Sequence, residues 1–221
     1  MVKILVILFL SLPLSSFSQL SMIELEEKPV PHPATRDSAV DSWNLSQPNY
    51  NNLPDQAKEL LYWINYCRNS PQKFWDSVIS PVLATFPTLN KSEARSLRID
   101  LAKVGRLPMF GLYEELTKTA QAHASDIARK RTPLGHNSTD GTDFSTRMRR
   151  AGIKSCANEN ISLSSQSIVL SVVLLYLDIG LPDLGHRKSL LDPNLRETGV
   201  GSALYGKDQY FLVQDMACLQ N

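Results

Sequence analysis

The chain has 221 residues, of which 43% are hydrophobic and 20% are charged, and its formal net charge is +1. This length and composition suit one main globular domain with a substantial core and some additional sequence. A charge balance so close to neutral gives no electrostatic basis for binding nucleic acid or an anionic membrane, so neither partner is expected.

The N-terminal residues have the features of a secretory signal peptide. Lys3 precedes an apolar run from Ile4 to Leu14, and Ser16-Phe17-Ser18 provides small residues at its exit. A transmembrane anchor would need about 20 apolar residues, and this run is shorter and interrupted by serine and proline. We therefore predict a signal peptide over residues 1–18, cleaved before Gln19, and a neutral mature chain that has no transmembrane anchor and is extracellular or periplasmic.

The next segment, residues 19–53, is rich in proline, serine, asparagine and aspartate and has no sustained hydrophobic period. Such a composition predicts a flexible linker. His32 lies between two prolines in this segment and is interpreted as a solvated residue rather than a ligand. The folded domain is expected to occupy residues 54–221.

Several helices are predicted at the start of this domain. Pro54 is a good first-turn residue, and the residues after it that fall at helical spacing and are expected to face the core are Leu60, Leu61, Ile64 and Cys67. Pro71 marks a break or a restart. Asn90 followed by Glu93 resembles a capping box that opens a helix through about Val104, with Gly105 as its stop.

The clearest helical pattern runs from Leu112 to Lys130. His123 lies on its apolar stripe among alanines, which favours a satisfied core histidine over a ligand. Thr142 or Asp143 is expected to cap a shorter helix that ends at Gly152. The basic residues of that segment are interpreted as a solvated helix face; they are Arg147, Arg149, Arg150 and Lys154.

The last third of the chain mixes strands with one helix. Cys156 to Ser162 alternates loosely, as a strand does, and Ser164 to Asp178 reads as a buried helix, with a strand as the rival interpretation. Thr198 to Tyr205 and Gln209 to Cys218 are expected to form a hairpin. Local helices followed by late strands indicate an α+β architecture.

Three cysteines in a secreted chain allow one disulfide and leave one thiol. Cys156 and Cys218 both lie in segments expected to be extended, whereas Cys67 lies on a predicted helix. We therefore favour a Cys156–Cys218 bridge, although the sequence alone leaves the pairing open.

Three short polar loops carry reactive side chains: Gly135-His136-Asn137-Ser138, Asn158-Glu159-Asn160-Ile161 and Gly185-His186-Arg187. Together with the further motifs Ala120-x-x-His123-Ala124, Asp140-Gly141, Arg147-x-x-x-Ala151-Gly152, Val200-Gly201 and Val213-Gln214-Asp215, their order resembles the bacterial branch of the CAP superfamily. That name covers cysteine-rich secretory proteins, antigen 5 and pathogenesis-related proteins of class 1, which share the SCP domain. The match covers roughly Pro54 to Leu219.

The resemblance implies a three-layer α-β-α sandwich of the CAP/SCP type, with a central cleft lined by two histidines and two acidic residues. His136 and His186 match the histidine pair, and Glu159 matches the first acid in its Glu-Asn-Ile context, with Asn160 beside it in the cleft. The second acid is a glutamate in many members, and Asp178 is the nearest counterpart here. Asp183 is a weaker candidate for that place. The additional disulfides and the cysteine-rich module of many eukaryotic members are absent from this sequence.

The chemistry of these residue types agrees with such a site. Two neutral imidazoles with a carboxylate nearby are a plausible ligand set for a divalent metal such as zinc. Glu159 could then be a ligand, an acceptor that orients an imidazole, or a base acting on water. Alternatively, these side chains serve only to cap helices and satisfy loop amides.

Three functions follow from these alternatives. The first is a secreted protein whose cleft binds a divalent metal and a small molecule, a lipid or an extracellular partner. Lipid and sterol binding is known in the family and is implied by that analogy alone. The second is a metal-dependent hydrolase in which Glu159 activates water. The third is an extracellular interaction scaffold with an inert cleft.

Overall fold

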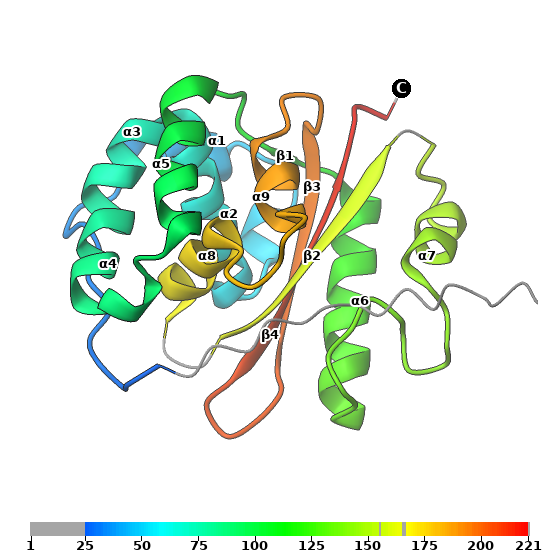
Figure 1. The fold of residues 1–221 in the computed structure, drawn as a ribbon. Coiled ribbons are helices and arrows are strands. Elements are labelled where there is room, and N and C mark those ends of the chain that lie inside the picture. The colour runs from blue at the N-terminus through cyan, green and yellow to red at the C-terminus, as the bar shows by residue number, and fades with distance from the viewer. Residues whose placement is uncertain (1–24, 155, 165–166, 221) are drawn as a thin grey trace, which may run out of the picture.

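A four-stranded sheet lies between two layers of helices in the computed structural model, which describes residues 25–220 except 155, 165 and 166 (Figure 1). The strand order is β1-β3-β4-β2, with β1 parallel to β3 and the other neighbours antiparallel. The strands are β1 Gly111–Leu112, β2 Ala157–Ser164, β3 Glu197–Leu204 and β4 Tyr210–Ala217. The expected α+β sandwich is confirmed. The predicted signal peptide, residues 1–18, and its cleavage before Gln19 lie outside the described residues.

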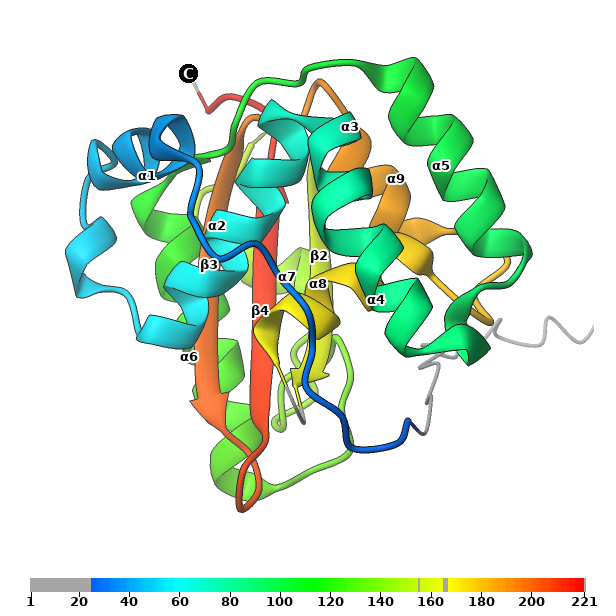
Figure 2. The same ribbon diagram turned by 90° about the vertical axis from the view of Figure 1, so that its left-hand side faces the viewer.

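The two helical layers differ in size. One face of the sheet is covered by α6, Glu114–Lys130, with α7, Phe144–Arg150, beside it. On the opposite face α2, α8 and α9 contact the strands, and the remaining helices pack around them (Figure 2). These helices are α1 Ser38–Leu45, α2 Asp55–Asn69, α3 Pro71–Phe74, α4 Ser80–Thr85, α5 Ser92–Val104, α8 Ile168–Leu177 and α9 Gly185–Leu191, with short turns η1 Tyr50–Asn52, η2 Trp75–Ile79 and η3 Pro87–Leu89. No helix in the described part of the chain is long and apolar enough to cross a membrane.

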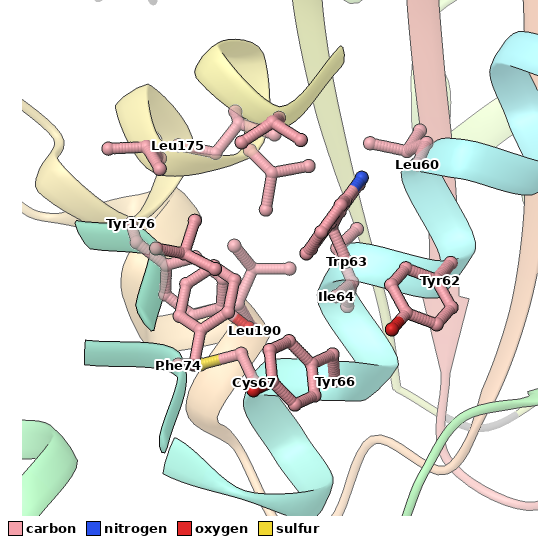
Figure 3. Packing of buried hydrophobic residues seen from close by; sticks show 14 of the residues in the cluster. Leu60, Tyr62, Trp63, Ile64, Tyr66, Cys67, Phe74, Leu175, Tyr176 and Leu190 are labelled. Atoms are coloured by element: carbon pink, nitrogen blue, oxygen red, sulfur yellow. The ribbon is translucent and has the colours of Figure 1, made fainter. Parts of the chain in front are cut away.

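The main hydrophobic core lies between α2, α8 and the sheet. The apolar stripe predicted on α2 is confirmed, because all four of its residues, Leu60, Leu61, Ile64 and Cys67, are buried. Side chains of α2, α3 and α8 meet in this core, and the rings of Phe74 and Tyr176 lie 5.5 Å apart (Figure 3). Since α8 packs against α2, α5 and β2, nearly every side of it is covered. This explains why its sequence is apolar all round, and the segment is a helix, as predicted.

The flexible linker predicted for residues 19–53 is wrong over its second half. Residues 38–45 form α1, which Asp37 caps by accepting from the amides of Ala39 and Val40. Asn44 is fully buried, and its side-chain oxygen accepts from Asn65 Nδ2 at 2.9 Å. The polar composition misled the prediction because a polar side chain enters a core readily when a partner there satisfies it.

Two smaller predictions also need correction. The predicted capping box at Asn90 and Glu93 does not form: α5 begins at Ser92, and Lys91 precedes it without a side-chain cap. Gly105 does end this helix, at φ 64°. The helix expected from Leu112 begins two residues later, because Gly111–Leu112 pairs with β3 as the edge strand β1. A strand of two residues has no periodicity that a sequence can display.

The predicted strands and the disulfide are confirmed. β3 and β4 form the expected hairpin, and Cys156 is bonded to Cys218 across a sequence separation of 62 residues. The bridge joins the start of β2 to the end of β4, where the Cys218 amide also donates to the Cys156 carbonyl at 3.0 Å. Cys67 is the free, buried cysteine. Such a bridge restricts the unfolded chain to conformations in which the loop is closed, and this stabilises the folded protein by about 2–4 kcal/mol.

Arg68, at the C-terminal end of α2, joins that helix to two later segments of the chain. Its guanidinium donates to the carbonyls of Pro108, Leu190, Asp192 and Leu195 at 2.7–3.1 Å. Burial lowers the pKa of this side chain to about 10, so it stays charged at neutral pH. Because each of its three nitrogens donates to a carbonyl, the buried charge fixes where the loop after α9 returns to the sheet.

α6 approaches β3 so closely that two positions of the strand must be glycine. A Cβ on Gly199 would lie 2.0 Å from backbone atoms of Leu116 and Thr117, and one on Gly201 would lie 2.5 Å from the backbone of Ala120. A helix backbone cannot move locally to make room, so the whole helix would have to shift.

We expect Gly199→Ala to destabilise the protein by about 3 kcal/mol or more, because overpacking against backbone is not relieved by a side-chain rotation. Urea unfolding followed by circular dichroism measures this. The matched control is Gly135→Ala, where an added Cβ meets nothing within 4 Å. Equal stability of the two variants would contradict the close packing of α6.

Candidate functional site

His136 lies in the loop between α6 and α7 and contacts a buried carboxylate on β2. Its Nδ1 is 2.8 Å from Glu159 Oε1. The other oxygen, Oε2, accepts from Arg147 Nη2 on α7 at 2.5 Å. The Glu159 side chain is 1% exposed and that of Arg147 is 10% exposed, whereas His136 is 37% exposed. An imidazole at the surface is thus held by an ion pair beneath it.

The electrostatics of Glu159 favour its ionised form. Burial opposes ionisation, but the hydrogen bond from His136 and the charge of Arg147 outweigh it, so the pKa of this carboxyl lies below its usual value. An ionised carboxylate only accepts hydrogen bonds, so His136 Nδ1 carries the proton and donates. Arg147 also donates to the His136 carbonyl at 2.7 Å, which ties the loop to the same guanidinium.

His186, at the start of α9, has a similar partner. Its Nδ1 is 2.6 Å from Asp178 Oδ1, and Asp178 Oδ2 accepts from the Arg187 amide at 2.9 Å. Asp178 ends α8 in the left-handed conformation, at φ 53°, which aspartate tolerates better than most residues. The shorter side chain therefore does reach the second histidine, and Asp183, the weaker candidate, is exposed.

Arg187, the residue after His186, is buried and fixes this loop. Its side chain donates to the carbonyls of Tyr176, Leu177 and Glu93 at 2.7–2.9 Å. It also donates to Ser96 Oγ and to Asp100 on α5. The backbone that carries His186 is therefore held from two helices at once.

The two histidine–carboxylate pairs flank the edge strand β2. Glu159 points toward α7, whereas its neighbour Asn158 donates to Ser189 Oγ on α9 at 3.2 Å. Asn160 faces the same side as Asn158, and its Nδ2 lies 3.4 Å from Gln214 Oε1. Glu159 and Asn160, predicted to share one cleft, therefore lie on opposite faces of the strand, because successive side chains of a strand alternate. α7 and α9 lie on opposite sides of β2 in Figure 1. That both histidines line one cleft stays a prediction.

Two residues of this cluster escaped the sequence analysis. The interpretation of Arg147 as part of a solvated face is wrong: its side chain is 10% exposed and pairs with Glu159, while Arg149 and Arg150 are exposed. The motif Arg147-x-x-x-Ala151-Gly152 was a signal that set it apart from its neighbours. Asp215 was noted only as part of a motif, yet it is fully buried and accepts from Thr119 Oγ1 at 2.6 Å.

His123, predicted to be a satisfied core histidine, is 1% exposed and contacts the Gly135 carbonyl through Nε2 at 2.9 Å. Its Nδ1 has no hydrogen-bond partner in the described part of the chain. Burial lowers its pKa, which keeps the ring neutral at physiological pH. Among the described residues, no three His, Cys, Asp or Glu side chains are grouped as a metal site of three such ligands would require.

Comparison with known proteins identifies the family. The model of the CAP family, described as the cysteine-rich secretory protein family, matches residues 104–216, just over half of the chain. The chain therefore belongs to the CAP family. No curated protein matches the sequence.

The solved structures to which the chain is similar are distant. An extracellular protein containing an SCP domain from Bacillus anthracis is 24% identical over 51% of this chain and 35% of its own, with a TM-score of 0.39, so the chain spans about a third of that protein. An outer surface protein from Borrelia burgdorferi is 18% identical over 57% of this chain and 86% of its own, with a TM-score of 0.43. NaASP2, solved with Zn²⁺, is 14% identical over 77% and 83%, with a TM-score of 0.41.

We expect Arg147→Met to cost about 3–5 kcal/mol at pH 7, because it leaves Glu159 as a buried charge without its partner. The folded pKa of Glu159 is depressed, so this stabilisation is present above the unfolded pKa, about 4.3, and is lost as pH falls through the folded pKa. Urea unfolding at pH 7 and at lower pH should therefore show the deficit shrinking in acid. Arg149→Met, on the exposed side of α7, is the control and should change stability by less than about 0.5 kcal/mol. Equal effects would refute the buried ion pair.

Proposed function

We propose that this CAP-family protein is secreted and binds a divalent metal, zinc by its donor chemistry, through His136 and His186. The metal would then take a small molecule, a lipid or an extracellular partner at its open positions. The observation that carries this proposal is that each imidazole turns Nδ1 toward a carboxylate, Glu159 in one case and Asp178 in the other. Histidines that ligate metals almost always donate their second ring nitrogen in this way.

Both the residue type and the protonation of His136 and His186 suit a metal ligand. With the proton of each ring on Nδ1, the Nε2 atom carries a lone pair, which is the form in which imidazole binds zinc. Neither Nε2 has a hydrogen-bond partner among the described residues. His136 and His186 are 37% and 20% exposed, so both rings remain open to solvent.

Each neighbouring residue then has a separate task. Glu159 and Asp178 fix the tautomer and the direction of the two rings, and Arg147 keeps Glu159 ionised under them. Arg187 holds the backbone of the second loop. A bound zinc ion would supply a Lewis acid that binds and polarises an oxygen of the ligand.

The contacts of Glu159 favour binding over hydrolysis. A base that activates water needs an oxygen within hydrogen-bond reach of that water. Glu159 is 1% exposed, and its two oxygens accept from His136 and Arg147. Both oxygens of Glu159 are therefore occupied by these contacts. We prefer the role of orienting His136 to that of a base in a metal-dependent hydrolase. An interaction scaffold with an inert cleft is what remains if no metal binds.

Secretion is supported by the disulfide. Disulfides persist in extracellular and periplasmic compartments and are rare where thiols are kept reduced. The Cys156–Cys218 bridge joins two strands that belong to the folded domain. A disulfide in this domain agrees with the signal peptide expected at residues 1–18.

We expect the purified protein to bind one zinc ion per chain and His136→Ala or His186→Ala to lower the affinity by more than about a hundredfold, because each removes a ligand. Isothermal titration calorimetry of the metal-free protein with zinc measures both. His32→Ala, which changes an exposed histidine in the N-terminal segment, is the control and should bind as the wild type does. If the two variants bind zinc as tightly as the wild type does, the proposed site is excluded.

The role of Glu159 is tested by Glu159→Gln. If Glu159 orients His136, the variant should bind zinc about 10- to 100-fold more weakly, the usual effect of removing a carboxylate behind a histidine ligand. If it activates water, zinc affinity should hardly change while turnover of ester or peptide substrates by the zinc-loaded protein disappears. Arg149→Met serves as a surface control in both assays.

A further inference from the structure

A second carboxyl group lies directly beside Glu159 under α6. In the register of β2 with β4, Glu159 is opposite Asp215, and residues directly opposite in an antiparallel pair present their side chains on the same face. Both side chains are buried, with Asp215 at 0% exposure. On the other side of β4 the partner of Asp215 is Gly199, which has no side chain. The two acids therefore share one closed compartment.

Among the described residues, Arg147 is the one guanidinium that donates to either of these two acids. Arg147, from α7, donates to Glu159. Asp215 Oδ2 accepts from the Thr119 hydroxyl of α6, while its Oδ1 has no hydrogen-bond partner among the described residues. The other titratable groups that act on the pair are His123, on α6, whose pKa is lowered by burial, and His136, whose Nδ1 donates to Glu159. Two carboxylates facing each other here would leave one negative charge without a partner.

We propose that Asp215 is held as a neutral carboxylic acid that donates its proton to the Glu159 carboxylate, and that it thereby acts as a positioning residue for His136. A protonated carboxyl is a donor as well as an acceptor, so the unpartnered Oδ1 acquires a role. Glu159 then accepts from His136, Arg147 and Asp215 together. The compartment becomes electrically neutral, with one carboxylate and one guanidinium.

The electrostatic environment agrees with this arrangement. Burial raises the pKa of Asp215 well above its usual value, and the charge of Glu159 beside it adds to the shift. The pKa of Glu159 moves the opposite way because His136 and Arg147 stabilise its charge. When the pKa values of two interacting acids are moved in opposite directions in this way, the pair retains one proton over the pH range between the two values.

The proton has a consequence for stability. The folded pKa of Asp215 is raised above the unfolded value, about 3.9, so folding takes up a proton above that pH. The contribution of this proton to the stability of the folded protein is most favourable in acid and is lost as pH rises toward the folded pKa of Asp215. Asp215→Asn removes this dependence, because the amide is nearly the same shape, can donate to Glu159 and does not titrate.

The test compares urea unfolding of the wild type, Asp215→Asn and Asp208→Asn, an exposed control at the tip of the same hairpin. The unfolding equilibrium constant of the wild type relative to Asp215→Asn should rise about tenfold per pH unit from pH 5 to 7, the effect of one proton. Relative to Asp208→Asn it should stay constant. Carbon-13 NMR of the wild type should show the Asp215 carboxyl still protonated at pH 7. The proposal would be overturned if the ratio of the two unfolding equilibrium constants, wild type to Asp215→Asn, did not change with pH, or if the carbon-13 signal showed an ionised Asp215.

The positioning role rests on the proposed zinc site and is tested separately. Asp215→Asn should keep the zinc affinity of the wild type, whereas Asp215→Val, which cannot donate to Glu159, should weaken it by about tenfold. Loss of affinity in both variants, or in neither, would overturn the positioning role. If the wild type takes up no zinc, the proposed function fails, while the stability profile and the NMR signal still decide whether Asp215 holds its proton.

Discussion

The register of β2 against β4 is the constraint on which the candidate site depends. Because side chains alternate along a strand, Glu159 points to the α7 side while Asn158 and Asn160 point to the other. A slip of one residue would place the carboxylate under α9 and leave Arg147 without a partner. The Cys156–Cys218 bridge and the hydrogen bond between the same two residues fix that register at the end of the strand nearest the site.

Buried arginines perform a related task elsewhere in the molecule. Arg68 and Arg187 each donate to several carbonyl oxygens of segments far apart in the chain. Arg147 differs because it pairs with a carboxylate that itself holds a histidine. The first two guanidiniums satisfy backbone groups that would otherwise be buried without partners, and the third adjusts the charge of the site. Arg147 and Arg187 tie the two histidine loops to neighbouring elements, and a binding site requires side chains held in place in this way.

Much of the fold was readable from local pattern. The helix after Pro54 and the helix through His123 were predicted because their apolar periodicity is long and continuous, and the buried helix before Asp178 because its apolar run is long. The strand β1 and the helix α1 were missed for the opposite reason. The first has two residues, and the second buries Asn44 against Asn65, a contact between residues 21 positions apart that no local pattern encodes.

The residue types available for the site follow from the sequence alone: two histidines in short loops, a glutamate on a strand, an aspartate after a helix, and two cysteines in extended segments. How they pair depends on the packing of the elements, since each partner comes from a different element. Arg147 shows this most clearly, because its sequence motif sets it apart from Arg149 and Arg150 but does not identify Glu159 as its partner. Its burial follows from the direction in which α7 packs toward Glu159. The protonation of Asp215 likewise depends on a neighbour 56 positions earlier in the chain, which only the pairing of β2 with β4 brings beside it.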